Sequence, residues 1–264
     1  MKRQISIFLL ALASVILQGH EFWIEPDKFR VQPGETIVAN FKVGENFSGE
    51  LWDLKKSRIE KLAWFHKAKT RDLKTSAQEG QKEHLKMVLQ EEGTHLVVME
   101  SNHAFIALDG KSFNEYLKED GLDDAYYLRK KNEQLEDSAT EIYSRHTKLL
   151  LQAGTRTDET YKKVVGLPVE IIPERNPYLL KKGDPVRFKI LYGGKPYFGA
   201  KVKVWNRHNN RTMVQNIYAQ QDGMIETHIS NPGMWMVSVV KMVPSGDPKA
   251  QWQSYWGSLI FGIQ

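Results

Sequence analysis

The sequence of 264 residues contains no cysteine. Disulfide bonds, thiolate metal ligands, cysteine nucleophiles and a lipid-modified N-terminal cysteine are therefore excluded. It also lacks a G-x-S-x-G nucleophile elbow, a G-x-x-x-x-G-K-[ST] phosphate loop and an H-E-x-x-H metal-binding helix. We therefore expect a protein that is not an enzyme and that uses no organic cofactor.

A strong excess of one charge is also missing. The chain has 37 lysine and arginine residues against 32 aspartate and glutamate residues, a formal net charge of +5. These basic residues form no dense run of the kind that follows a phosphate backbone, so nucleic acid is not an expected partner. The apolar run from Ile5 to Leu17 is shorter than the roughly 20 residues that span a bilayer, and no later run is longer. We expect no membrane span once the N-terminus is processed.

Residues 1–19, "MKRQISIFLLALASVILQG", have the three regions of a secretory signal peptide. Lys2 and Arg3 form the basic start, the apolar run follows, and the small residue Gly19 stands where cleavage would occur. We expect export of a soluble mature chain, into the periplasm if the cell is Gram-negative.

Cleavage after residue 19 would make His20 the N-terminus. Its α-amine and its imidazole Nδ1 would then form a two-nitrogen chelate suited to Cu(II), Ni(II) or zinc. Cleavage near Ala13 would instead leave His20 inside a tail, and cleavage after Leu17 would place it third, as in a square-planar copper or nickel site. The alternative interpretation is that His20 only begins a strand.

Two domains are expected after the signal. Residues 20–163 show short alternating apolar runs broken by "EP", "QPGE" and "VGEN", which predict antiparallel strands, including ones near 62–65, 84–89, 95–100 and 104–108. Helical spacing, with Ser112 as the expected cap and a second helix from about 123 to 152, predicts a helical insertion at about 112–152.

Residues 164–264 contain only strand and turn patterns. Glycine-containing breaks such as "LYGGKPY" predict hairpins, and about seven short strands predict an immunoglobulin-like β-sandwich. Trp252 and Trp256 lie four residues apart on one strand face, which we expect to point inward. The predicted fold class is thus mainly β, an N-terminal β-rich domain with a helical insertion followed by this sandwich.

Several stretches resemble a known bacterial family in the same order along the chain. They are "GHEFWIEP", "FNEYLKEDGLDD", "YSRHTKLLLQAG", "VGLPVEIIPERNPYLLKKGDPVRFKIL", "GKPYFGAKVKVW", "QDGMIETHISNPGMWMVSVVKMVP" and "WQSYWGSLIF". The family is DUF4198, which is related to NikM-like periplasmic components associated with nickel and cobalt uptake. The resemblance implies an exported two-part protein that handles transition metals with a metal-transport partner in the envelope. Lys241 stands where many relatives have a histidine, and a protonated lysine is a poor metal ligand.

Two histidines are the predicted metal ligands. His20 is chosen for its chelate, and His103 because it stands at an expected strand end. The predicted function is binding or delivery of nickel, cobalt or copper. The alternative is an envelope interaction module that binds a partner protein or a glycan through its sandwich and no metal. An oxidative enzyme with a copper brace is a third class, for which the sequence holds no motif.

Overall fold

The computed structural model describes residues 20–80 and 82–264. The predicted signal peptide, residues 1–19, lies outside the described residues. The fold is mainly β, as predicted, and its strands form three sheets that enclose two apolar cores. In the described part, no helix has the length and apolar character needed to cross a membrane.

The largest sheet, called the central sheet here, contains ten strands and runs through both halves of the chain. Eight of them follow one another in space, in the order β15 (Arg211–Tyr218), β14 (Lys201–His208), β17 (Gly233–Pro244), β18 (Trp252–Ile263), β10 (Ala139–Ala153), β8 (Gly93–Ser101), β5 (Ile59–His66) and β6 (Lys69–Asp72). The short strands β2 (Arg30–Val31) and β9 (Ala104–Leu108) also pair with β10.

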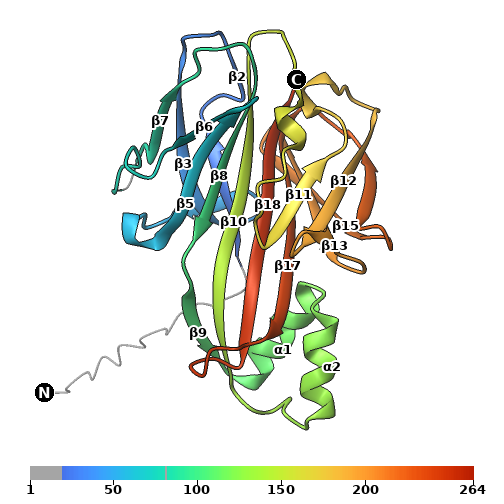
Figure 1. Ribbon diagram of the computed structural model, residues 1–264. Helices are drawn as coiled ribbons and strands as arrows, with labels where there is room; N and C mark the ends of the chain where they lie inside the picture. The colour runs from blue at the N-terminus through green and yellow to red at the C-terminus, as the bar shows by residue number, and fades with distance from the viewer. Residues whose placement is uncertain (1–19, 81) are drawn as a thin grey trace, which may run out of the picture.

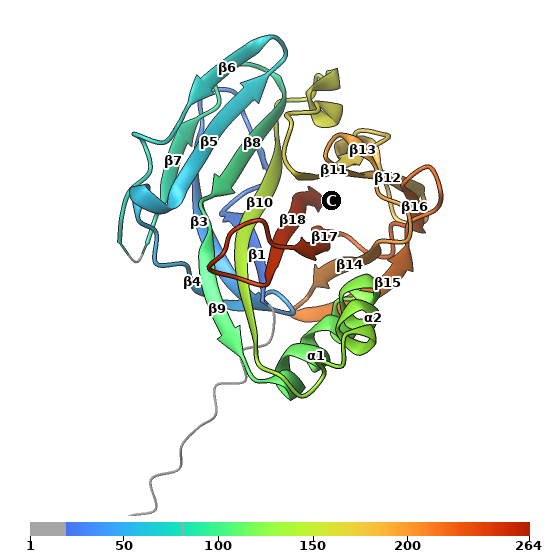
Figure 2. The same ribbon diagram turned by 60° about the horizontal axis from the view of Figure 1, so that its bottom comes forward.

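Two smaller sheets cover opposite sides of the central sheet (Figures 1 and 2). The N-terminal sheet consists of β1 (Glu21–Pro26), β3 (Thr36–Glu45), β4 (Ser48–Leu51) and β7 (Leu85–Val88). The C-terminal sheet consists of β11 (Val169–Pro173), β12 (Pro185–Tyr192), β13 (Lys195–Pro196) and β16 (Met224–His228). Short 3-10 turns at Lys56–Arg58, Glu159–Lys162 and Pro177–Leu179 lie in the connections.

Alternation of side chains along the central strands divides the two cores. On β10, Leu150 faces the core under the C-terminal sheet, whereas Leu149 and Leu151 face the core under the N-terminal sheet. Successive side chains of a strand point to opposite faces, so a strand covered on both sides becomes apolar throughout. This explains the run "LLL" in the middle of the chain.

The predicted second helix is wrong beyond Lys131. Helix α2 spans Asp123–Lys131, and the residues predicted to continue it form the long strand β10 from Ala139 to Ala153. Nine residue pairs join β10 in parallel to β18, from Glu141 opposite Trp252 to Leu149 opposite Ile260. Because β10 is buried on both faces over much of its length, its apolar residues lost the period-2 signal that separates a strand from a helix.

The helical insertion is therefore short and lies at one end of the central sheet (Figure 1). Helix α1 spans Gly110–Glu119, and its cap is Asp109, which accepts a hydrogen bond from the Ser112 backbone N–H at 2.9 Å, rather than the predicted Ser112. Trp252 and Trp256 point inward as predicted: Trp252 is buried, and the ring of Trp256 stacks on Tyr116 of α1 with centroids 5.8 Å apart.

Candidate functional site

One open cavity brings together several titratable side chains with metal-ligating chemistry. This histidine cleft, with a volume of about 260 Å³, lies where the end of β8 and the following turn meet β10 and β18. Its lining residues are Glu60, Glu100, Ser101, Asn102, His103, Ser144, His146, Pro168 and Tyr255. A hydrogen bond of 2.9 Å from the Arg145 backbone N–H to Ser101 Oγ joins the end of β8 to β10.

His146 is the innermost of these ligating side chains. It is 2% exposed, and its Nε2 lies 2.9 Å from Ser144 Oγ. Its Nδ1 has no hydrogen-bond partner and lies 3.7 Å from Glu100 Oε1. Burial, with a smaller contribution from His103, lowers the pKa of His146 to about 3. The imidazole is therefore neutral at physiological pH, the form that binds metals.

Glu100 and His103 line the same cleft. Burial raises the pKa of Glu100, while the nearby Lys61 and His103 act in the opposite direction. His103 is exposed at the rim, and its Nε2 lies 3.2 Å from Gln253 Nε2, so the amide donates to the ring. His103 thus lies at a strand end, as predicted, beside a buried histidine that the sequence placed in a helix.

These side chains do not yet form a closed coordination shell. Within residues 20–80 and 82–264, no three His, Asp or Glu side chains stand close enough together to hold a metal ion as they are. The cleft offers one buried imidazole nitrogen and one carboxylate at short range, with a second imidazole on the rim. Two nitrogens and one oxygen suit borderline divalent ions such as Ni(II), Co(II), Cu(II) and zinc.

His20 and His103, the two predicted ligands, have different surroundings. The exposed His20 precedes β1, and its Nδ1 lies 3.9 Å from Glu45 Oε1 on β3, whereas His103 contacts Gln253 of β18. Among the described residues no contact joins the two rings. The His20 amine-and-imidazole chelate depends on cleavage within residues outside the described part, so it stays a prediction.

The remaining buried histidines pack against other rings, and one of them, His66, also has a ring nitrogen, Nε2, that has no hydrogen-bond partner and lies 3.8 Å from Glu91 Oε2. His66 and His95 stack with ring centroids 4.3 Å apart, and Trp64 stacks on His95 at 5.6 Å. Both nitrogens of His95 are occupied, by Trp64 Nε1 at 3.1 Å and by the Glu91 carbonyl oxygen at 2.8 Å. His84 is held similarly, because its Nδ1 accepts from the Phe41 backbone N–H at 2.9 Å and its Nε2 lies 3.0 Å from the Gly80 carbonyl oxygen.

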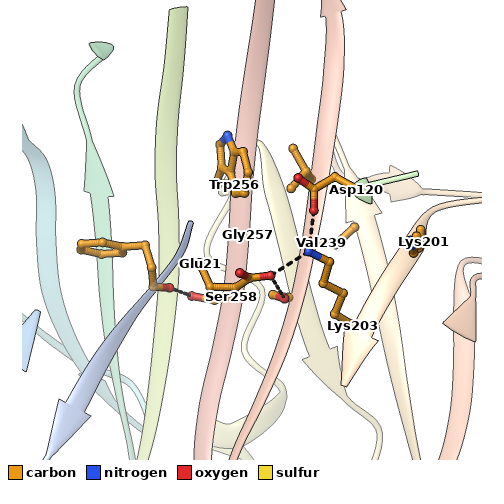
Figure 3. A pocket seen from close by; sticks show the side chains of 11 residues that line it. Glu21, Asp120, Lys201, Lys203, Val239, Trp256, Gly257 and Ser258 are labelled. Carbon is orange, nitrogen blue, oxygen red and sulfur yellow. Dashed lines mark hydrogen bonds and ion pairs between the residues drawn. The ribbon is translucent and has the colours of Figure 1, made fainter. Parts of the chain in front are cut away.

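A second polar cavity, of about 10 Å³, contains a buried charge cluster (Figure 3). The Lys203 ammonium lies 2.6 Å from Asp120 Oδ1 and 3.2 Å from Glu21 Oε1. The three residues come from β14, the end of α1 and β1, so this cluster links three distant segments of the chain. The cavity has room for about one water. We interpret the charge cluster as a structural feature that stabilises the fold.

Burial and the single ammonium group shift the pKa values of the residues in this charge cluster. Burial raises the pKa of Glu21 to about 7, with Lys203 acting to lower it and Asp120 to raise it. Burial also raises the pKa of Asp120. The two carboxyl groups raise the pKa of Lys203 despite its burial, so the lysine is charged. Because Glu21 follows His20 directly, the charge cluster holds the first strand of the folded chain in place.

Lys241, the residue that departs from the resembling family, occupies an aromatic environment. Its Nζ lies 4.9 Å from the ring centroid of Tyr197, 5.7 Å from that of Tyr192 and 3.8 Å from Asp124 Oδ2. A cation over two aromatic faces is stabilised by the ring quadrupoles. This lysine therefore connects α2 to the C-terminal half and offers no ligand to the histidine cleft.

Comparisons with known proteins give one family match. A family model described as "Domain of unknown function (DUF4198)" matches residues 17–242. No curated protein matches the chain. Among solved structures, a Salmonella alpha-2-macroglobulin reacted with methylamine is 12% identical with a TM-score of 0.24, over 91% of this chain and 15% of that one. Three N-terminal domains of the bacteriophage RB49 highly immunogenic outer capsid protein are 8% identical with a TM-score of 0.20, over 93% of this chain and 71% of theirs. Neither similarity is high enough to carry an argument.

Proposed function

The chain belongs to the DUF4198 family, and from this premise we propose that it is an exported accessory protein that binds a divalent transition-metal ion in the histidine cleft. The ion is its cargo, taken up in the periplasm and passed to a metal-transport partner in the envelope. No catalytic step is part of this proposal.

The observation that supports it is the unpartnered Nδ1 of His146. A buried nitrogen without a hydrogen bond costs about 1–3 kcal/mol unless another group satisfies it. This nitrogen lies 3.7 Å from Glu100 Oε1, and both residues line the cleft. A cation between the two groups would satisfy both, because the lone pair of the nitrogen and the carboxylate oxygen are both acceptors.

The donor set favours the class of metal. Hard cations such as Ca²⁺ and Mg²⁺ prefer oxygen ligands, and Glu100 is the carboxylate nearest His146 Nδ1. Imidazole nitrogens suit nickel, copper, zinc and cobalt. We assign His146 and Glu100 as the inner ligands and His103 as the rim ligand that closes over the ion. A His20 chelate would be a separate site, since its ring contacts Glu45 instead.

Calorimetric titration of the mature protein with Ni(II), Co(II) and Cu(II) tests this function, after mass spectrometry has identified the N-terminus. We expect His146→Ala to weaken binding by about tenfold or more and His103→Ala to weaken it less, because ligand loss removes a metal bond. His228→Ala is the matched control, since His228 is an exposed histidine on β16, outside the cleft.

His20→Ala separates the two predicted sites. If binding is lost in this variant and kept in His146→Ala, the metal binds at the N-terminus and the cleft proposal fails. If the wild-type protein binds none of the three ions, the alternative function remains, an interaction module that binds a partner protein or a glycan.

A further inference from the structure

One edge of the central sheet is open. Strand β15 (Arg211–Tyr218) pairs with β14 on one side, and no strand of the described chain pairs with its other side. Three of its apolar side chains are well exposed: Met213, Val214 and Tyr218 are 47%, 44% and 56% exposed. An open edge strand presents unpaired backbone N–H and C=O groups that can pair with another strand.

The hairpin before β15 determines which backbone groups point outward. Asn209 and Asn210 form its two-residue turn and have φ angles of 49° and 58°, as in a type I′ turn. In such a hairpin the flanking pair, His208 and Arg211, is hydrogen-bonded, and hydrogen-bonded pairs then alternate along the strands. The register between β14 and β15 has no bulge. The outward-pointing groups therefore belong to Thr212, Val214, Asn216 and Tyr218.

Charge distinguishes this edge from the opposite one. Strand β6, the other end of the sheet, reads "KTRD" and has exposed charges of both signs, which discourage strand addition. In contrast, the seven residues from Thr212 to Tyr218 have no charged side chain. The β15 edge therefore lacks the charges that keep edge strands apart.

We propose that β15 pairs with β15 of a second copy of this chain, antiparallel and centred on Gln215, so that the central sheets of two molecules become continuous. This register uses the outward groups on both strands: Val214 pairs with Asn216 of the second copy, and Thr212 with Tyr218. The paired segment coincides with the uncharged run.

Side chains are also compatible with this register. Met213 lies directly opposite Ile217 of the second copy in a non-hydrogen-bonded pair, where side chains approach most closely. Gln215 faces its own symmetry mate across the twofold axis; its Oε1 accepts from Thr227 Oγ1 of its own chain at 2.6 Å, and its amide N–H group can donate to the amide oxygen of the mate. The one charged residue of the strand, Arg211, lies outside the paired run. No like charges therefore face each other, which makes a second copy the partner that fits.

Analytical ultracentrifugation of the mature protein tests the proposal. We expect the wild-type protein to sediment as a concentration-dependent dimer. Gln215→Lys would place two lysines opposite each other at the axis and should weaken the dimer by roughly tenfold or more. Gln220→Lys is the matched control, because it adds the same charge at an exposed position beyond the strand and should leave the dimer intact.

Val214→Pro provides a test that does not depend on charge. Its N–H points away from β14 in the derived register, so proline removes an intermolecular donor and spares the hairpin. Gln215→Lys also removes the hydrogen bond from Thr227 Oγ1, so Gln215→Ala, which removes the same bond without adding charge, is compared with it. Dimer loss in Val214→Pro and Gln215→Lys, with the dimer kept in Gln215→Ala, supports the proposal. A wild-type monomer at every concentration overturns it. If Val214→Pro weakens the dimer and Gln215→Lys does not, the twofold register is also overturned. This result would indicate that another strand binds this edge.

Discussion

Lys148 and Glu170 form a fully buried ion pair: Nζ lies 2.9 Å from Oε1, and each side chain is 1% exposed. Lys148 comes from β10 and also donates to the Lys163 carbonyl oxygen at 2.9 Å. Glu170 comes from β11 and accepts from the backbone N–H groups of Val165 and Gly166 at 2.8 and 3.0 Å. The pair thus holds the segment between the two halves of the chain against the central sheet.

Removing one member of this pair is expected to be costly. Lys148→Met would leave the Glu170 carboxylate buried with only its two backbone donors. Losing one partner of a buried ion pair typically costs about 3–5 kcal/mol, which is a large share of the 5–15 kcal/mol that stabilises a typical protein. Urea unfolding should show a corresponding fall in the free energy of unfolding.

A double variant separates the missing charge from the missing volume. Lys148→Met with Glu170→Gln removes the unpaired charge and keeps an acceptor oxygen for one of the two N–H groups, which bond to different oxygens of Glu170, so it should recover part of the loss. A single variant as stable as the wild type would show that the pair does not hold the segment.

Glu141 should make stability depend on pH. It is buried against Tyr116 and Ser254, whose hydroxyl groups donate to it, and burial raises its pKa from 4.5 to about 7. Between these values the folded protein keeps a proton that the unfolded chain releases, so the Glu141 contribution to stability falls as pH rises from 4.5 to about 7. The loss is about 3 kcal/mol in total.

Glu141→Gln isolates this contribution from the other titrating groups. The amide keeps an acceptor oxygen and does not ionise. We expect the difference in free energy of unfolding, variant minus wild type, to increase between pH 4.5 and 7 and to stay level above pH 7. A difference that is independent of pH would mean that Glu141 has an ordinary pKa in the folded state.

Short strands bounded by turn residues could be predicted from the sequence, including β8, which is buried on both faces. The strands predicted near 62–65, 84–89, 95–100 and 104–108 fall within or overlap β5, β7, β8 and β9, respectively. The Gly193–Gly194 hairpin was equally predictable, since both residues adopt positive φ angles of 56° and 74°. Strand β10 was not predictable, because burial on both faces removes the alternation and its length of 15 residues is more typical of a helix than of a strand.

The candidate site shows the same limit. His103 could be selected because a strand end is a local property. His146 could not, because its meeting with Glu100 depends on the long-range pairing of β10 with β8 and β9. The side-chain alternation of β10 places Ser144, His146 and Lys148 on one face, whereas the predicted helix would turn His146 away from Ser144. Side-chain chemistry alone therefore predicts histidine as a ligand type but not the residues that lie beside it.

Gly93 occupies a position that excludes a side chain. Its φ of +134° is one that L-residues rarely adopt, and an added Cβ would lie 2.1 Å from Asp158 Oδ2 and 2.7 Å from His66 Cε1. Asp158 is not free to move, because it accepts from the Thr94 backbone N–H at 3.1 Å. We expect Gly93→Ala to destabilise the protein by clearly more than about 1 kcal/mol, measured as a fall in Tm.

Gly34→Ala is the control for backbone strain alone. Gly34 also has a positive φ, +89°, but an added Cβ meets no atom within 4 Å. The difference in Tm between the two variants therefore measures the clash. Equal losses would show that only the backbone angle matters and that the Asp158–Thr94 contact yields without cost.

Ser144 is expected to act as a positioning residue for the proposed metal site. Its Oγ lies 2.9 Å from His146 Nε2. When Nε2–H donates to this hydroxyl, the Nδ1 lone pair is directed toward Glu100, and groups that orient a metal-binding imidazole in this way typically contribute 10–100-fold to affinity. Ser144→Ala should therefore weaken metal binding by roughly tenfold. Ser48→Ala, an exposed serine on β4, should not.

A purely structural role for Ser144 would not change the coordination geometry. The visible absorption of bound Co(II) reports that geometry, so it should differ between Ser144→Ala and the wild type, with thermal unfolding unchanged. Ser144→Thr keeps the hydroxyl and should restore both the affinity and the spectrum. If Ser144→Ala binds Co(II) with wild-type affinity and an identical spectrum, the hydroxyl does not orient His146, because the free ring would otherwise present a different nitrogen to the ion.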